Sequence, residues 1–173
     1  KALTFEKRLN QIGIELNTNS DLYRIGCALL EFQEKHLRPR ITDYYEDIRQ
    51  KFVEILGYTN FINKLLPFIE SGYCETIKPH LRLLNESSIL QNSKSRVSDQ
   101  GSNKLLELYI ASLCYPTFSN IELDNPLKST GHNPDITFNY RNQKWGIACK
   151  VLHSKNAQSI YNNIEKGIEQ GIE

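Results

Sequence analysis

Two residues of this chain combine suitable types and spacing for chemistry, Asp135 and Lys150, which fall on two predicted strands joined by a short loop. Side chains alternate along a strand, so Lys150 shares a strand face with Ala148. A lysine among apolar residues is costly to bury unless a negative group faces it. Asp135 opens the preceding strand, and the hairpin brings it to the same sheet edge as Lys150. The pair would offer a carboxylate to a hard cation and an ammonium to a water or an oxyanion.

The elements that must hold this pair follow from a change in the spacing of apolar residues. From residue 118 onward apolar and polar residues alternate, which predicts strands over about 118–124, 133–140 and 144–152. The last two should form adjacent antiparallel strands, because only a few residues join them. Helical spacing predicts one helix before the strands, at about 102–114, and another that begins near residue 156.

The first half of the chain has apolar residues at helical spacing, which predicts a small helical bundle. Asp21 is expected to cap the second helix and Gly57 to end the third. His80 is interpreted as a packing or surface histidine. A polar stretch rich in Ser and Asn, residues 85–96, marks the predicted boundary between a helical domain, 1–93, and a second domain, 94–173. Each of the five predicted helices has a row of apolar residues along one face, and these rows begin at Phe5, Leu22, Tyr45, Phe61 and Ile77.

The composition is that of a globular protein, with 39% hydrophobic and 24% charged residues, and this argues against disorder. The net charge of +1 does not favour a broad phosphate-binding face. No apolar run approaches the roughly 20 residues of a membrane helix, and no signal-peptide pattern is present. The four separated cysteines form no CxxC pair, which predicts reduced thiols in a cytoplasmic protein.

A family resemblance rests on two segments, Asn133-Pro134-Asp135-Ile136 and, after the hairpin, Gly146-Ile147-Ala148-Cys149-Lys150-Val151. Together they resemble the PD-(D/E)xK motif of restriction-endonuclease-like nucleases. The resemblance covers residues from about 98 to 173, where the order of helix, three-stranded meander and helix also matches the core of that superfamily. It implies an α+β or α/β fold, in which a helical N-terminal bundle precedes a restriction-endonuclease-like core that is truncated at its C-terminus.

The resemblance also implies roles for individual residues. Asp135 and Glu107 would bind Mg²⁺, for which Mn²⁺ would substitute, and Lys150 would activate water or stabilise the transition state. Glu107 falls on the predicted helix 102–114, on a face without large aliphatic residues, so it can lie close over the sheet edge.

One position departs from the family pattern, because Ala148 stands where the family has Asp or Glu. Three accounts remain open. The alanine is a deliberate change that prevents cleavage, or the acid is supplied from elsewhere, with Glu165 on the final helix as the nearer candidate, or the site only binds.

The expected function is Mg²⁺-dependent hydrolysis of phosphodiester bonds by a DNA endonuclease of the restriction or defence type. RNA remains an alternative substrate. The helical half would recognise substrate, form a homodimer, or hold the core inactive until a signal arrives. Two other hypotheses are a nucleic-acid-binding module without catalysis and an interaction protein that acts through its helical half. Metal binding through Asp135 is expected of the enzyme and distinguishes that hypothesis from the other two.

Overall fold

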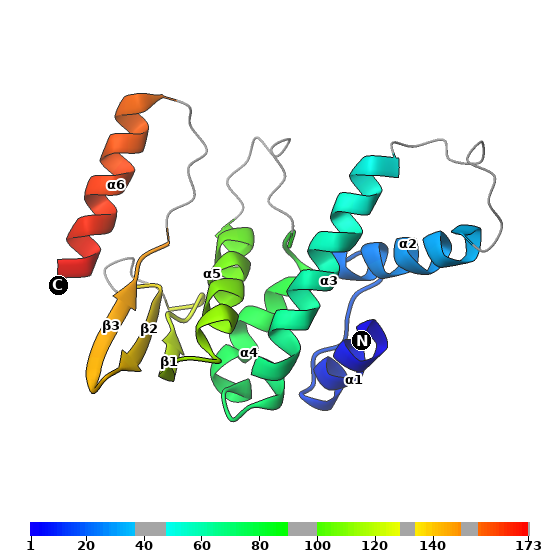
Figure 1. The fold of residues 1–173 in the computed structure, drawn as a ribbon, viewed down its shortest axis with the longest axis horizontal. Helices are drawn as coiled ribbons and strands as arrows, with labels where there is room; N and C mark the ends of the chain where they lie inside the picture. The colour runs from blue at the N-terminus through cyan, green and yellow to red at the C-terminus, as the bar shows by residue number, and fades with distance from the viewer. Residues whose placement is uncertain (37–47, 90–99, 129–133, 150–155, 173) are drawn as a thin grey trace.

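The structure is a computed structural model that describes residues 1–36, 48–89, 100–128, 134–149 and 156–172. Four helices and a short 3₁₀ turn come first, then a fifth helix, three strands and a last helix (Figure 1). This mixture of helices and an antiparallel sheet confirms the predicted α+β class. The elements are α1 (Ala2–Gln11), α2 (Asp21–His36), α3 (Ile48–Glu70), α4 (Cys74–Arg82), η2 (Leu83–Asn85), α5 (Gln100–Cys114), β1 (Ser119–Leu123), β2 (Ile136–Tyr140), β3 (Gln143–Ile147) and α6 (Ala157–Ile172).

Helix α3 corrects the prediction that Gly57 ends a helix, because it continues through that residue to Glu70. The apolar positions on both sides of Gly57 are in phase, so Ile55, Tyr58 and Leu65 all reach the core from one helix. A glycine inside a helix costs about 1 kcal/mol relative to alanine, and burial of this continuous stripe outweighs that cost.

The beginning of α2 also differs in detail from the prediction. Asp21 is the first residue of the helix, and the cap is Ser20, whose hydroxyl accepts a hydrogen bond of 3.2 Å from the backbone N–H of Tyr23. A serine hydroxyl at the position before the helix satisfies one of the unpaired N–H groups of the first turn.

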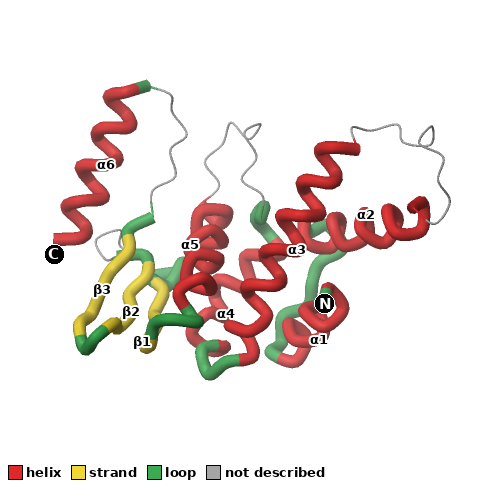
Figure 2. Tube along the Cα trace, in the orientation of Figure 1, coloured by secondary structure: helices red, strands yellow, loops and turns green. Residues whose placement is uncertain are grey.

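The sheet is an antiparallel meander in the order β1-β2-β3 (Figure 2). Strands β2 and β3 pair from Ile136 opposite Ile147 to Tyr140 opposite Gln143, which confirms the predicted pairing of these segments. Arg141 and Asn142 connect them, both with positive φ, 51° and 63°. Two such residues form the turn type that matches the twist of a tight hairpin.

Strand β3 is shorter than predicted, since it ends at Ile147 and not near residue 152. The backbone N–H of Cys149 donates a hydrogen bond to the side chain of Asp135, with 2.7 Å between N and Oδ2. The carboxylate thus binds the N–H of Cys149 just beyond the last strand pair. Residues 150–152 of the predicted strand lie outside the described residues.

One hydrophobic cluster runs from α1 to β2, with Phe5 near its beginning and Phe138 near its end. Helix α5 lies at the centre of this cluster, where it packs against α3, α4 and β1. The rings of Phe118 and Phe138 stack at the sheet end of the cluster, with centroids 4.2 Å apart. The predicted domain boundary between residues 93 and 94 lies outside the described residues.

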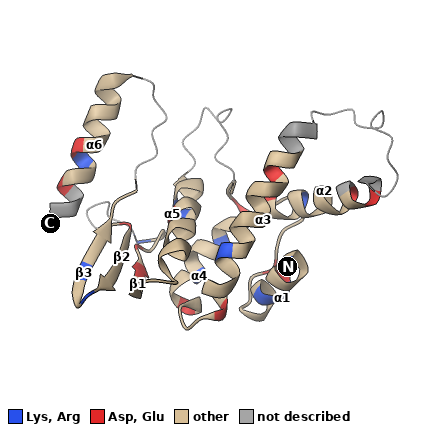
Figure 3. Cartoon of the chain, viewed as in Figure 1, with Lys and Arg blue, Asp and Glu red and all other residues tan. Residues whose placement is uncertain are grey.

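The surface of the described residues is mixed in charge and partly apolar. Figure 3 shows Lys and Arg interspersed with Asp and Glu along the drawn elements, without a face of one sign. Helix α6 exposes the apolar side chains Tyr161, Ile164 and Ile168. None of the described helices is long and apolar enough to cross a membrane.

Candidate functional site

Three carboxylates surround one buried ammonium where α5 meets the end of the sheet. The Nζ atom of Lys104 lies 2.8 Å from Glu107 Oε2, 3.3 Å from Asp135 Oδ1 and 3.8 Å from Asp124 Oδ2. Each of the four side chains is at most 14% exposed. We call Lys104, Glu107, Asp124 and Asp135 the Lys104 cluster.

Helix α5 supplies two members of this cluster because Lys104 and Glu107 are three residues apart and so share one side of the helix. Their neighbours Leu105 and Leu108 are buried in the core and fix the rotation of the helix. Burial raises the pKa of Glu107 to about 7, although Lys104 acts in the opposite direction. Burial alone would lower the pKa of Lys104, but Glu107 and Asp135 together raise it above its ordinary value. Lys104 is therefore a protonated cation at neutral pH.

The two aspartates lie side by side at the end of the sheet. Leu123 of β1 pairs with Ile136 of β2, and the backbone N–H of Asp124 donates to the carbonyl oxygen of Asp135 at 2.9 Å. The pairing therefore extends by one residue and sets Asp124 opposite Asp135. Both oxygens of Asp135 have partners, since Oδ1 faces Lys104 and Oδ2 accepts from Cys149.

Ala148 is the first residue beyond the last pair of β2 and β3. Ile136 pairs with Ile147, so continuing the register by one residue places Ala148 opposite Asp135. Opposite residues of an antiparallel pair direct their side chains to the same face, and an acid at this position would face the cation site from β3. The row across the end of the sheet is thus Asp124 and Asp135, with Ala148 next in line if the register of β2 and β3 is continued.

A close backbone approach holds the start of β2 against β3. A Cβ atom placed on Gly146 would lie 2.8 and 2.9 Å from the ring carbons Cγ and Cβ of Pro134. Only a glycine lets the proline before Asp135 pack this closely over the strand.

The structure brings together two of the predicted site residues, Glu107 and Asp135, through the ammonium of Lys104. Lys150, the predicted catalytic lysine, lies outside the described residues. Glu165, the predicted substitute acid, is exposed on α6, and in the described part of the chain no hydrogen bond or ion pair joins it to Glu107 or Asp135.

Lys104 and Asp124 belong to the cluster but were not predicted from the sequence. Lys104 is recognisable as a site residue only from its spacing of three before Glu107, a pattern that is common on exposed helices. Asp124 gave a clearer signal, because it ends the first strand of a meander whose second strand begins near Asp135. In an antiparallel pair, the end of one strand and the start of the next share a sheet edge.

Two further polar groups adjoin the cluster. His80 of α4 is fully buried, and neither ring nitrogen has a hydrogen-bond partner among the described residues. Burial and the nearby Lys104 lower its pKa to about 4, against the opposite effect of Asp124. Burial, with the charges of Asp135 and Glu107, raises the pKa of the Cys149 thiol to about 12. Both groups are therefore neutral at pH 7.

The chemistry of the carboxylates suits a hard divalent cation, since Mg²⁺ and Mn²⁺ prefer carboxylate oxygens. In the described residues, however, no group of three or more His, Cys, Asp and Glu side chains is arranged to hold a metal ion. The carboxylates instead surround the ammonium of Lys104. The carboxylate oxygens of the Lys104 cluster thus face a cation of the chain itself.

We compared the chain with protein-family models, curated proteins and solved structures. No family model, no curated protein and no solved structure matches it.

Proposed function

We propose that this protein is a metal-dependent nuclease that hydrolyses phosphodiester bonds, an endonuclease of the restriction or defence type. The proposed substrate is DNA, with RNA as the alternative, and the proposed location is the cytoplasm. The single observation that carries the proposal is the meeting of Glu107 and Asp135 around one cation, 2.8 and 3.3 Å from Lys104 Nζ. A helix glutamate and the aspartate of a strand hairpin are the two metal ligands that the PD-(D/E)xK resemblance implies.

The proposed division of roles uses residues on three elements. Glu107 from α5 and Asp135 from the start of β2 would hold Mg²⁺, with Mn²⁺ as a substitute. When bound, the metal stabilises charge on the scissile phosphate and lowers the pKa of bound water. The Cys149 N–H fixes one oxygen of Asp135 and leaves the other directed at the cation site. Lys150 remains the proposed group that orients the attacking water.

Ala148 makes the proposed enzyme slow or inactive in its present sequence. An oxygen-ligand site that lacks one carboxylate loses both negative charge and a coordination position. The loss of one group that stabilises a transition state costs roughly 3–4 kcal/mol in comparable cases, or about 10²- to 10³-fold in rate.

The test is plasmid cleavage in Mg²⁺ and in Mn²⁺ by the full chain and by two matched variants, Ala148→Glu and Ala148→Gln. The two substitutions have the same size, and only the first restores a carboxylate. We expect Ala148→Glu to cleave roughly 10²-fold faster than the parent or more, while Ala148→Gln stays at the parent rate. Lys150→Ala in the Ala148→Glu chain should remove the gained activity.

Other outcomes select among the remaining accounts. Parent activity that Glu165→Ala abolishes would show that the acid comes from α6. If no variant cleaves DNA or RNA with either metal, the nuclease proposal is wrong and a binding module without catalysis replaces it.

A second candidate function, an interaction protein that acts through its helical half, is favoured by one observation. Helices α1 and α2 border an apolar hollow of about 300 Å³ that Tyr58 of α3 completes. Leu3 and Leu30 line this hollow and are exposed, 77% and 57%. An interaction protein of this kind would take up no Mn²⁺ in a calorimetric titration, whereas the proposed enzyme would bind Mn²⁺ and lose that binding on Asp135→Asn substitution.

A further inference from the structure

We propose that Lys104 competes with the divalent cation for the same position, and that Asp124 is the third carboxylate ligand of this site. This inference rests on the proposed metal site and goes beyond it. It assigns a further carboxylate ligand beside Glu107 and Asp135, and a residue that controls access of the metal.

Asp124 is supported by its place in the row at the end of the sheet. It lies opposite Asp135 on the β1 side, whereas on the β3 side Ala148 is the first residue beyond the last strand pair. Asp135 therefore has a carboxylate neighbour on the β1 side. Asp124 Oδ2 lies 3.8 Å from Lys104 Nζ, and its side chain is only 13% exposed. Asp124 already contributes to the binding of a cation.

Lys104 is supported as the competitor by the balance of charge around it. One ammonium faces three carboxylates within 4 Å, so the cluster has more negative than positive groups. Buried carboxylates are stable only when a cation or a proton compensates them. A divalent cation at the same position would compensate them better, and it must displace the ammonium because the two cations repel each other.

His80 is an independent sign that a polar partner is missing beside the cluster. Its imidazole is fully buried, and neither ring nitrogen makes a hydrogen bond of good geometry among the described residues, although the backbone of Asp124 is near enough to favour the protonated ring. Buried polar groups in folded proteins are nearly always paired with protein or with an ordered water. A hydrated metal would bring water ligands to this imidazole, which the ammonium of Lys104 does not.

The experiment is a calorimetric titration of the full chain with Mn²⁺, together with thermal unfolding in EDTA and in Mn²⁺. The test variant is Lys104→Met, whose unbranched side chain is one atom shorter and carries no charge. The matched control is Lys144→Met, since Lys144 also pairs with a carboxylate at 3.3 Å, that of Glu122, but on the exposed surface. Lys104→Arg keeps the charge and tests whether the positive charge itself matters.

We expect Lys104→Met to bind Mn²⁺ roughly tenfold more tightly than the parent, the size of effect seen for residues next to metal ligands. Adding Asp124→Asn should remove this gain. Lys144→Met and Lys104→Arg should bind as the parent does. If Lys104→Met is unfolded in EDTA, its recovery in Mn²⁺ supports the proposal, because the metal then replaces the ammonium.

Two results would overturn the inference. Lys104→Met that is folded but binds Mn²⁺ no more tightly than the parent shows that Lys104 is not a competitor. Lys104→Met that stays unfolded in EDTA and in Mn²⁺ shows that a metal cannot take the place of the ammonium. The nuclease proposal is tested separately and fails if Ala148→Glu does not cleave. Tighter Mn²⁺ binding by Lys104→Met without cleavage by Ala148→Glu would therefore contradict only the nuclease proposal. Cleavage by Ala148→Glu without tighter Mn²⁺ binding by Lys104→Met would contradict only the competition between Lys104 and the metal.

Discussion

The carboxylate of Asp135 accepts a hydrogen bond from the backbone N–H of Cys149, with 2.7 Å between Oδ2 and N, while its other oxygen faces Lys104 Nζ at 3.3 Å. One side chain thus joins β2, the segment after β3 and helix α5. Asp135 has a structural role at this junction whether or not a metal binds there.

Asp135→Asn should destabilise the protein even in EDTA. An amide has one oxygen, so its NH₂ group must face either the N–H of Cys149 or the ammonium of Lys104. We expect a loss of about 1–3 kcal/mol in the free energy of unfolding, the usual cost of an unsatisfied buried polar group. Urea unfolding at pH 7 measures it. Glu122→Gln on the exposed pair with Lys144 is the control and should change stability by less than about 0.5 kcal/mol. Equal effects of the two substitutions would contradict the role assigned to Asp135.

Gly146→Ala should loosen the start of β2. The added methyl group would lie 2.8 Å from Pro134 Cγ, so the proline must move away from the strand and shift Asp135 with it. We expect about 1–3 kcal/mol of destabilisation, as for other overpacked sites. Gly72→Ala is the matched control, because a Cβ atom there would meet no other atom within 4 Å. A Gly146→Ala variant as stable as Gly72→Ala would show that Pro134 does not pack on Gly146.

His80 should make the protein sensitive to mild acid. Its pKa in the folded protein is about 4, against 6.5 in the unfolded chain, so between these values the unfolded chain binds more protons. The contribution to stability is complete above pH 6.5 and is lost as the pH falls toward 4. The full shift corresponds to about 3 kcal/mol.

His80→Leu isolates this contribution from that of the carboxylates. Burial and Lys104 of α5 oppose protonation of His80, while Asp124 at the end of β1 favours it. The parent should lose more stability than His80→Leu when urea unfolding is repeated at pH 7 and pH 4.5. Parallel curves for the two proteins would mean that His80 is protonated equally well in both states.

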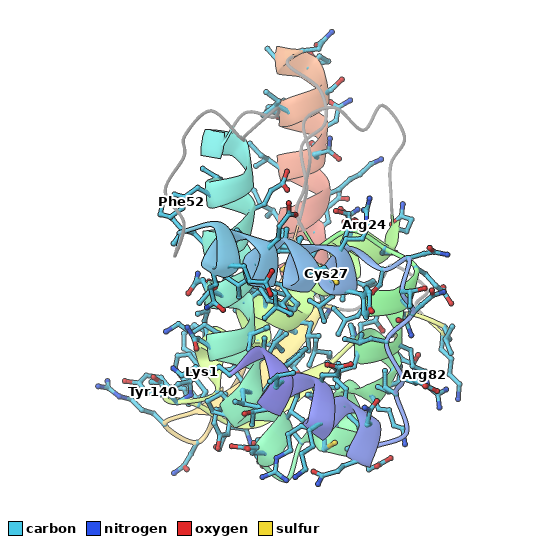
Figure 4. All side chains as sticks on the ribbon, turned by 90° about the vertical axis from the view of Figure 1, so that its right-hand side faces the viewer. Lys1, Arg24, Cys27, Phe52, Arg82 and Tyr140 are labelled. Atoms are coloured by element: carbon cyan, nitrogen blue, oxygen red, sulfur yellow. The ribbon has the colours of Figure 1, made fainter. Side chains whose placement is uncertain are left out.

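The cysteines should differ strongly in their reaction with iodoacetamide at pH 8. Cys27 is exposed on α2, on the side turned toward the viewer in Figure 4. Cys149 is partly buried, and its raised pKa of about 12 keeps it in the unreactive thiol form. Mass spectrometry of timed samples should find Cys27 modified first and Cys149 only after urea is added. Early modification of Cys149 in the native protein would contradict its placement beside Asp135 and Glu107.

Much of the fold was predictable from local patterns. The alternation over β1 and β2 and the short loop between Tyr140 and Gln143 determine the meander, because β1 and β2 each bury one face and a two-residue turn permits only antiparallel pairing of β2 with β3. The prediction at Gly57 was wrong because the low helix propensity of glycine is outweighed by burial of the apolar residues on both sides of it. That burial depends on tertiary packing and cannot be inferred from the glycine alone. Five predicted N-terminal helices are therefore four helices and a 3₁₀ turn.

The site was predictable only where the sequence had a motif. Glu107 and Asp135 were identified from their positions on a helix and at the start of a strand. The roles of Lys104 and Asp124 depend on how α5 lies against the sheet, and this arrangement comes from packing between residues distant in the sequence. A lysine three residues from a glutamate looks the same on an exposed helix, where it would contribute only a few tenths of a kcal/mol.

Helix α5 carries a consequence for the way this protein unfolds. Leu105 and Leu108 belong to the core that α5 shares with α3 and α4, while Lys104 and Glu107 on the same two turns hold the end of the sheet. A small domain with one continuous hydrophobic core usually unfolds in a single cooperative transition. The helical half and the sheet should therefore unfold together. A substitution that weakens the N-terminal helices should lower the temperature at which the Lys104 cluster is lost as much as it lowers the unfolding temperature of the helices.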